Sequence, residues 1–128
     1  MLLNLNSLTP IYIQIADWLE NEILNASINV DEKIYSQYQL AEMFNINPAT
    51  AAKGLNILAD EQVLYKKRGL GMFVSSGARE IILEKRKNQK LSGMVKELAM
   101  EAVQLNVGED ELVTLIKDMH RKIKEDMK

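Results

Sequence analysis

A short break between two apolar-periodic segments constrains this chain more than any other feature. Ser36 and Gln39 have the spacing at which each side chain can bind the other's free backbone N–H, a capping box that begins a helix. Asn45 tolerates the left-handed conformation of a helix exit. Asn47 followed by Pro48 then favours the start of a new helix. The sequence therefore predicts two helices joined by a turn of a few residues.

Helical geometry gives each of these helices an inward and an outward face. The outward face of the second helix combines short side chains with one cation, Lys53, so it can approach a polar surface closely. The positions expected to face the core are Leu40, Met43 and Phe44 in the first helix and Ala51, Leu55 and Leu58 in the second.

A hairpin is predicted after the second helix. Residues 63–67 and 72–74 have the pattern of two short strands, and Gly69 and Gly71 allow the positive φ of the turn between them. A polar helix face beside a cationic hairpin suits DNA, with the helix in the major groove and the hairpin on phosphates or in the minor groove. This is the pattern of a winged helix-turn-helix. We call residues 47–60 the recognition helix and residues 66–71 the wing.

The charge distribution limits how such a chain could bind DNA. A formal net charge of −2 argues against binding through charge alone. Apart from Lys33, every Lys and Arg in residues 1–75 lies on the recognition helix or the wing, so we expect a locally basic face. On a chain of negative net charge this face should bind nonspecific DNA only modestly, so we expect two DNA-binding domains, or heads, to act together. The acids expected on the far side are Asp17, Glu20, Glu22, Asp31 and Glu32.

Composition excludes several other classes of protein. The 128 residues, 47% of them hydrophobic, allow one compact domain plus an appendage. There is no cysteine, and no segment approaches the apolar length of a membrane span, so we expect a cytoplasmic protein without disulfides or membrane partners. No paired carboxylates or activated nucleophile are evident, and the single His120 is better explained as a surface residue than a ligand. We therefore expect no enzyme activity, cofactor or metal.

The segment before these helices adds to the pattern. Thr9 and Pro10 are predicted to begin a first helix by the same cap-then-proline arrangement, followed by an apolar stripe of scaffold type. Residues in an ordered series then match a known family: Pro10, Tyr12, Gln14, Ile15, Ala16, Leu19, Ile23, Ser36, Leu40, Ala41, Phe44, Ile46, Thr50, Leu55, Leu58, Leu64, Arg68, Gly69, Gly71 and Val74.

On these positions, residues 9–75 resemble the DNA-binding domain of the GntR family of bacterial transcription regulators. Asn47-Pro48 with Thr50, and the segment 65–74, are most similar to its YtrA subfamily. Many relatives have arginines where this chain has Pro48 and Ala52, which leaves more of the electrostatic work to Lys53 and the wing. With the resemblance, the expected DNA-binding residues are Ser36, Gln37, Tyr38, Asn47, Pro48, Ala49, Thr50, Lys53, Lys67, Arg68, Gly69 and Gly71.

The C-terminal part is predicted to form two long helices, over residues 79–105 and from about Asp110 to near the end. Both have apolar stripes that two helices alone cannot bury, so we expect a homodimer through residues 79–128. The resemblance agrees, because the YtrA subfamily has a short dimerisation part. The basic run 85–87 could contact the flanks of the DNA site, but a solvated helix face explains it better. The expected fold is thus mostly α with a small β-hairpin: a winged helix-turn-helix over 9–77 and a helical dimerisation segment over 78–128.

Two classes of function remain open on this basis. The first is a dimeric, sequence-specific regulator of transcription, in particular a repressor, bound to double-stranded operator DNA. The second is a protein interaction module that uses the winged fold as a docking surface, which the low net charge favours. Neither the operator nor any effector follows from the sequence.

Overall fold

The computed structural model describes residues 3–128, and the chain divides into two compact units between Lys85 and Arg86. The first unit contains α1 (Ile11–Leu24), α2 (Gln37–Phe44), α3 (Pro48–Asp60), β1 (Leu64–Lys67), β2 (Gly71–Val74) and α4 (Ala78–Arg86), whose last residue begins the second unit. The second unit continues with a π-helical segment η1 (Lys87–Leu91), α5 (Ser92–Gln104) and α6 (Glu109–Asp126). The predicted fold class, mostly helical with a small hairpin, is confirmed.

The core of the first unit forms where α1 and α3 approach each other closely. Gly54 of α3 is buried, and a Cβ added to it would lie 3.0 Å from both the backbone oxygen of Tyr12 and Cγ2 of Ile15. The absent side chain therefore sets the distance between the two helices. The large side chains that are fully buried here include Ile15, Leu19, Leu40, Leu58, Val63, Val74 and Ile82.

The inward positions expected in α2 and α3 are largely confirmed. Ala51 and Leu58 are completely buried, Leu55 nearly so, and Phe44 packs edge-on against Trp18 of α1 with ring centroids 5.0 Å apart. The prediction for Met43 is wrong, since its side chain is 48% exposed. The buried face of the eight-residue α2 also includes Ala41, which places the centre of that face about 100° from Met43.

Local capping chemistry fixes the helix-turn-helix as the sequence predicts. Ser36 and Gln39 form the capping box, Asn45 is left-handed with φ of 54°, and Asn47 caps α3 with Pro48 in its first turn. The expected start of α1 is wrong by one residue, because Pro10 and not Thr9 is the cap residue and no side chain caps this end. Here Gln14 Nε2 donates to the backbone oxygen of Thr9 at 3.0 Å, so a residue inside the helix anchors the preceding segment.

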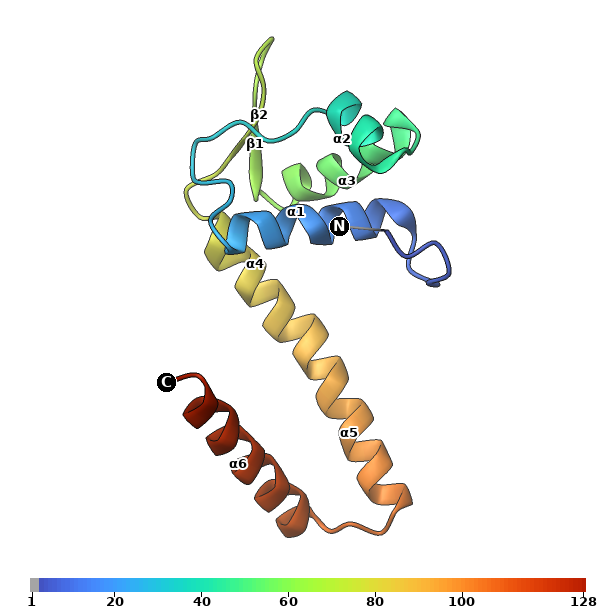
Figure 1. Cartoon of the computed structure of the whole chain (residues 1–128), viewed down its shortest axis with the longest axis vertical. Helices are drawn as coiled ribbons and strands as arrows, with labels where there is room; N and C mark the ends of the chain where they lie inside the picture. Colours follow the sequence, from blue (N-terminus) through green and yellow to red (C-terminus); the bar gives the residue numbers. More distant parts are fainter. Residues whose placement is uncertain (1–2) are drawn as a thin grey trace. The chain divides into compact units, whose positions relative to one another are not determined.

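The hairpin extends away from the helices of this unit (Figure 1). β1 and β2 are antiparallel, with Leu64 opposite Val74 and Lys67 opposite Gly71. The loop before α2 also pairs with β2, because Lys33 forms an isolated β-bridge with Phe73. The base of the wing is therefore fixed on both sides of β2.

The second unit consists of helices with little buried surface. Among its residues only Ala102 is buried, while the apolar stripe of α6 is about half exposed. The predicted break between the two helices is confirmed by the left-handed Asn106, with φ of 58°. Within residues 3–128, no helix is long and apolar enough to cross a membrane.

Candidate nucleic-acid interface

The amino-terminal turn of α3 presents small, accessible side chains. Asn47 and Ala49 are exposed, and Pro48 and Thr50 are half-buried. Asn47 Oδ1 accepts a hydrogen bond from the backbone N–H of Ala49 at 2.8 Å, which caps this end of the helix. Helix amino termini favour negative groups because their first N–H groups have no partner in the helix and the helix dipole is positive there. The predicted residues of this turn thus form one accessible surface that suits a phosphate-bearing ligand.

A crevice of about 240 Å³ joins the start of α2 to the base of the wing. Ser36, Gln37 and Tyr38 line it together with Gly71, so the structure brings two groups of predicted site residues together. Lys33 also lines this crevice, and a Cβ on Gly71 would lie 2.9 Å from its Cε. Lys33 was not among the predicted site residues, because only the pairing of its loop with β2 brings it to the wing.

Lys53 lies on the exposed face of α3, as predicted, but its side chain has a neighbour that the sequence did not indicate. Its Nζ lies 5.3 Å from the ring centroid of Tyr12, which is half-buried on α1. An ammonium over an aromatic face is held by the ring quadrupole. Tyr12 therefore restrains the cation that we expect at the middle of the DNA surface.

The wing carries accessible cations, and a pair of stacked aromatic rings lies on the strands directly beside it. Tyr65 and Phe73 stack across the hairpin with centroids 5.8 Å apart, and Nζ of Lys67 lies 4.6 Å from the Phe73 centroid. Arg68 is exposed at the turn, between the strands. Gly69 and Gly71 have φ of 77° and 115°, so the positive φ predicted for them is confirmed. The backbone at Gly69 can approach a ligand closely, because nothing lies within 4 Å of the place of its missing side chain, whereas at Gly71 the side chain of Lys33 fills that place.

Two of the acids expected on a solvated far side lie elsewhere. Glu20 is completely buried, where it binds Lys85. Asp31 accepts a hydrogen bond from the hydroxyl of Tyr65 at 2.8 Å, so it lies at the wing. This bond raises the pKa of Tyr65 above its ordinary value, with desolvation and the charge of Asp31 adding to the effect. The loop that contains Asp31 thus binds the strand that leads into the wing.

The Tyr65–Asp31 bond should make the stability of the protein sensitive to alkaline pH. The pKa of Tyr65 is higher in the folded protein than in the unfolded chain, where it is about 10. The contribution of the bond to the free energy of unfolding is therefore complete below about pH 10, and it is lost as the pH rises through the folded pKa. We expect the difference in unfolding free energy between wild type and Tyr65→Phe to shrink above about pH 10. Urea unfolding at several pH values measures this, and a difference that stays constant across that range would contradict it.

Comparison with protein families and curated proteins gives consistent matches. Residues 11–74 match the model of bacterial regulatory proteins of the gntR family. The transcriptional repressor NagR of Bacillus subtilis is 36% identical over 84 residues, which cover 66% of this chain and 35% of NagR. The repressor YtrA of the same organism is 28% identical over 118 residues, 92% of this chain and 90% of YtrA. The chain thus spans about a third of NagR but most of YtrA.

Solved structures show the same architecture. A GntR-family transcriptional regulator from Bacteroides thetaiotaomicron has a TM-score of 0.75 and 30% identity, with 92% of this chain and 99% of that chain covered. S. agalactiae BusR, in complex with its busAB-promotor DNA, has a TM-score of 0.55 and 34% identity, with 91% of this chain and 58% of that chain covered. The likeness to the first structure extends over nearly its full length.

Proposed function

We propose that this chain, which belongs to the GntR family of bacterial regulatory proteins and is a DNA-binding transcription regulator rather than an enzyme, acts as a dimeric repressor. In this proposal the recognition helix enters the major groove of operator DNA, and the wing contacts phosphates or the minor groove. The observation that carries it is the accessible start of α3, with Lys53 exposed further along the same helix and exposed cations on a wing whose Gly71 lines the crevice. The names of NagR and YtrA as repressors support the sign of regulation.

We also propose a domain organisation in which one part of the chain binds DNA and the other forms the dimer. Residues 9–77 would bind DNA, and residues 78–128 would hold two copies together in the cytoplasm, where operator DNA is found. The DNA-binding residues that we propose are those predicted from the sequence, and we add Lys33 because it shares the crevice with Ser36 and Gly71.

The exposed apolar surface of the second unit supports the homodimer. Large apolar side chains on α5 and α6 are about half exposed, in a stripe at helical spacing, and a second copy of this unit would cover them. The stripe consists of Leu91, Met94, Val95, Leu98 and Leu105 around α5, and of Leu115, Ile116, Met119, Ile123 and Met127 around α6.

Selection of bound sequences from a pool of random DNA duplexes tests the proposal. We expect enrichment of a motif with two-fold symmetry and a fixed spacing between its half-sites. If no sequence is enriched, the winged fold would instead be a docking surface for another protein, and the proposal would be wrong.

Replacing Lys53 with alanine should lower affinity for the selected site by roughly 1–3 kcal/mol and relax the preference at one base position. The reason is that the ammonium lies on the exposed face of α3, within reach of guanine O6 or N7 in the groove. Fluorescence anisotropy with the selected duplex and its single-base variants measures both effects. Lys117→Ala removes the same charge from an exposed position of α6 and should leave the affinity unchanged.

Replacing Arg68 with alanine should weaken binding to selected and random duplexes nearly alike. The side chain is exposed at the turn of the wing, where an interaction with phosphate or the minor groove carries little base information. The slope of log affinity against log salt should fall by about one unit for each phosphate that the variant no longer neutralises, or about two for a dimer. If neither Lys53→Ala nor Arg68→Ala changes affinity or salt dependence, this face does not bind DNA.

A further inference from the structure

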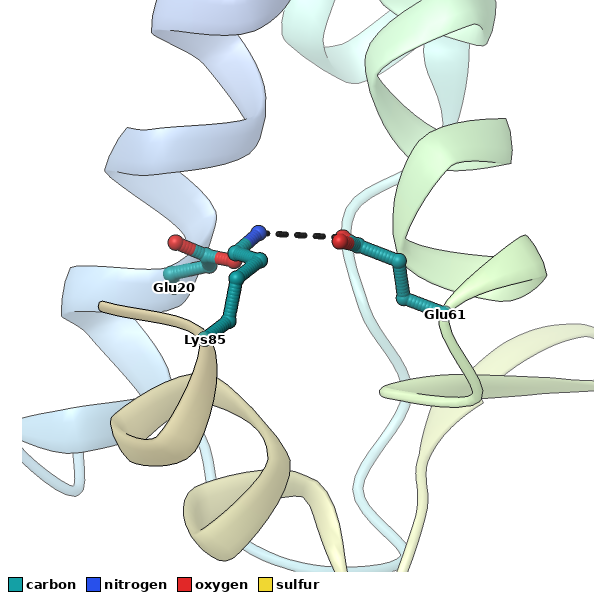
Figure 2. Close-up of polar contacts among 3 residues, drawn as sticks. All are labelled: Glu20, Glu61 and Lys85. Carbon is teal, nitrogen blue, oxygen red and sulfur yellow. Dashed lines mark hydrogen bonds and ion pairs between the residues drawn. The ribbon is translucent and has the colours of Figure 1, made fainter. Parts of the chain in front are cut away.

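A partly buried cluster of charges joins three segments of the first unit, in which the side chains of Lys85 and Glu61 are 21% and 30% exposed and that of Glu20 is 1% exposed. Figure 2 shows the ammonium of Lys85 between the carboxylates of Glu20 and Glu61. Glu20, on α1, is 0% exposed and accepts a hydrogen bond from Lys85 Nζ. The same ammonium donates to Glu61 Oε1 at 3.0 Å, and Glu61 is the residue that ends α3. The cluster therefore ties α4 to α1 and to the carboxyl end of the recognition helix.

The charges of this cluster depend on one another. Burial lowers the pKa of Lys85, but the hydrogen bonds with Glu20 and Glu61 outweigh burial, so the pKa is raised and the ammonium stays charged at neutral pH. A carboxylate as buried as Glu20 is costly unless it is paired. Glu61 adds negative charge where the dipole of α3 is already negative, and Lys85 offsets it. The ammonium thus has a defined position set by both partners.

Helix α4 is anchored along one face, and Lys85 is the final anchor. Ala78 and Ile82 are 0% exposed, and Arg79 Nη1 donates to the backbone oxygen of Leu24 at 2.6 Å, at the end of α1. Residues 78, 82 and 85 recur at helical spacing on that face. Lys85 is also the last residue of the first unit. The segment proposed to dimerise, residues 78–128, therefore begins with this anchored helix.

Buried ion pairs contribute little net stability compared with apolar residues of the same shape. They do require one geometry, however, since moving one charge away from its partner in a site shielded from water costs free energy. The buried side chains of Ala78 and Ile82 already hold α4 in the core of the first unit. The charged cluster therefore contributes less to the stability of this packing than to the orientation of α4 within it.

We propose that Lys85 is a positioning residue for operator recognition: by binding Glu20 and Glu61 it fixes the orientation of α4 against α1 and the recognition helix. This inference rests on the proposed dimeric function. Two heads joined through their second units can bind together only if each recognition helix meets its half-site, about one helical turn of DNA or a multiple of it from the other. Lys85 would thereby determine which half-site spacing the dimer accepts.

The test compares Lys85→Met with wild type on two kinds of duplex, one with a single half-site and a series with two half-sites at varied spacing. Because Lys85→Met leaves the carboxylate of Glu20 in the interior, the double variant Glu20→Gln/Lys85→Met removes both charges and decides the question if the single variant does not fold. Lys87→Met is the matched control, since it removes the same charge from an exposed side chain two residues further along. Circular dichroism and light scattering verify the fold and the mass of each protein.

We expect the double variant to keep wild-type affinity for the single half-site. Its affinity for the best-spaced two-fold site should fall roughly 2- to 30-fold, with a broader range of spacings accepted. Unchanged affinity for both duplexes would overturn the inference, and so would an equal loss on both, which would mean a structural role alone. If wild type itself binds two-fold and single sites alike, the proposed dimeric function fails, and that outcome is visible before any variant is compared.

Discussion

Replacing Ile116 and Ile123 of α6 with glutamate is expected to convert the protein to a monomer and to weaken binding to a two-fold operator roughly 10²- to 10⁴-fold. Both side chains are about half exposed on the apolar stripe, so in the proposed dimer a glutamate at either position would place a charge in a dry interface. The large effect arises because joined heads bind the second half-site as an intramolecular step, and a monomer does not have this advantage. Light scattering gives the mass, and anisotropy titrations give the affinities.

The single half-site provides the internal reference for this experiment. The monomer should bind it as well as one head of wild type does, because α3 and the wing are unchanged. Thr114→Glu is the matched control, since it adds a charge to the same helix at an exposed position outside the stripe. A wild-type protein that is a monomer at micromolar concentration, or a glutamate variant that remains a dimer, would refute the proposed interface.

The elements that could be predicted from the sequence are those with local causes. The capping box at Ser36, the left-handed Asn45 and the start of α3 at Asn47 each depend on side chains within a few residues of the backbone that they satisfy. The same holds for Gly69 and Gly71, whose positive φ belongs to the turn itself. These features locate the recognition helix and the wing, and hence most of the candidate surface.

The features that could not be predicted depend on interactions between distant segments. Lys85 and Glu20 are 65 positions apart, so nothing in the run 85–87 distinguishes a half-buried, ion-paired lysine from the solvated face that we expected. Lys33 reaches the wing only through its bridge with Phe73, and Tyr12 meets Lys53 only because α1 packs on α3. The prediction for Met43 fails because the buried face of the short helix α2 includes Ala41, which turns the centre of that face away from Met43.

Replacing Gly54 of α3 with valine is expected to destabilise the first unit by roughly 1–3 kcal/mol, towards the upper end of that range. DNA binding should fall by the fraction of the protein that is unfolded. A Cβ at this position would lie 3.0 Å from the backbone oxygen of Tyr12 and from Cγ2 of Ile15, and valine adds two methyl groups beyond it. Glycine in a helix interior costs about 1 kcal/mol relative to alanine, so the close approach of α1 explains why this residue suits the position. Gly93→Ala in α5 is the control, because nothing lies within 4 Å of the added Cβ and removing the glycine should stabilise that helix by up to about 1 kcal/mol. Urea unfolding of both variants measures the effects, and a Gly54→Val protein as stable as wild type would show that α1 and α3 can separate without cost.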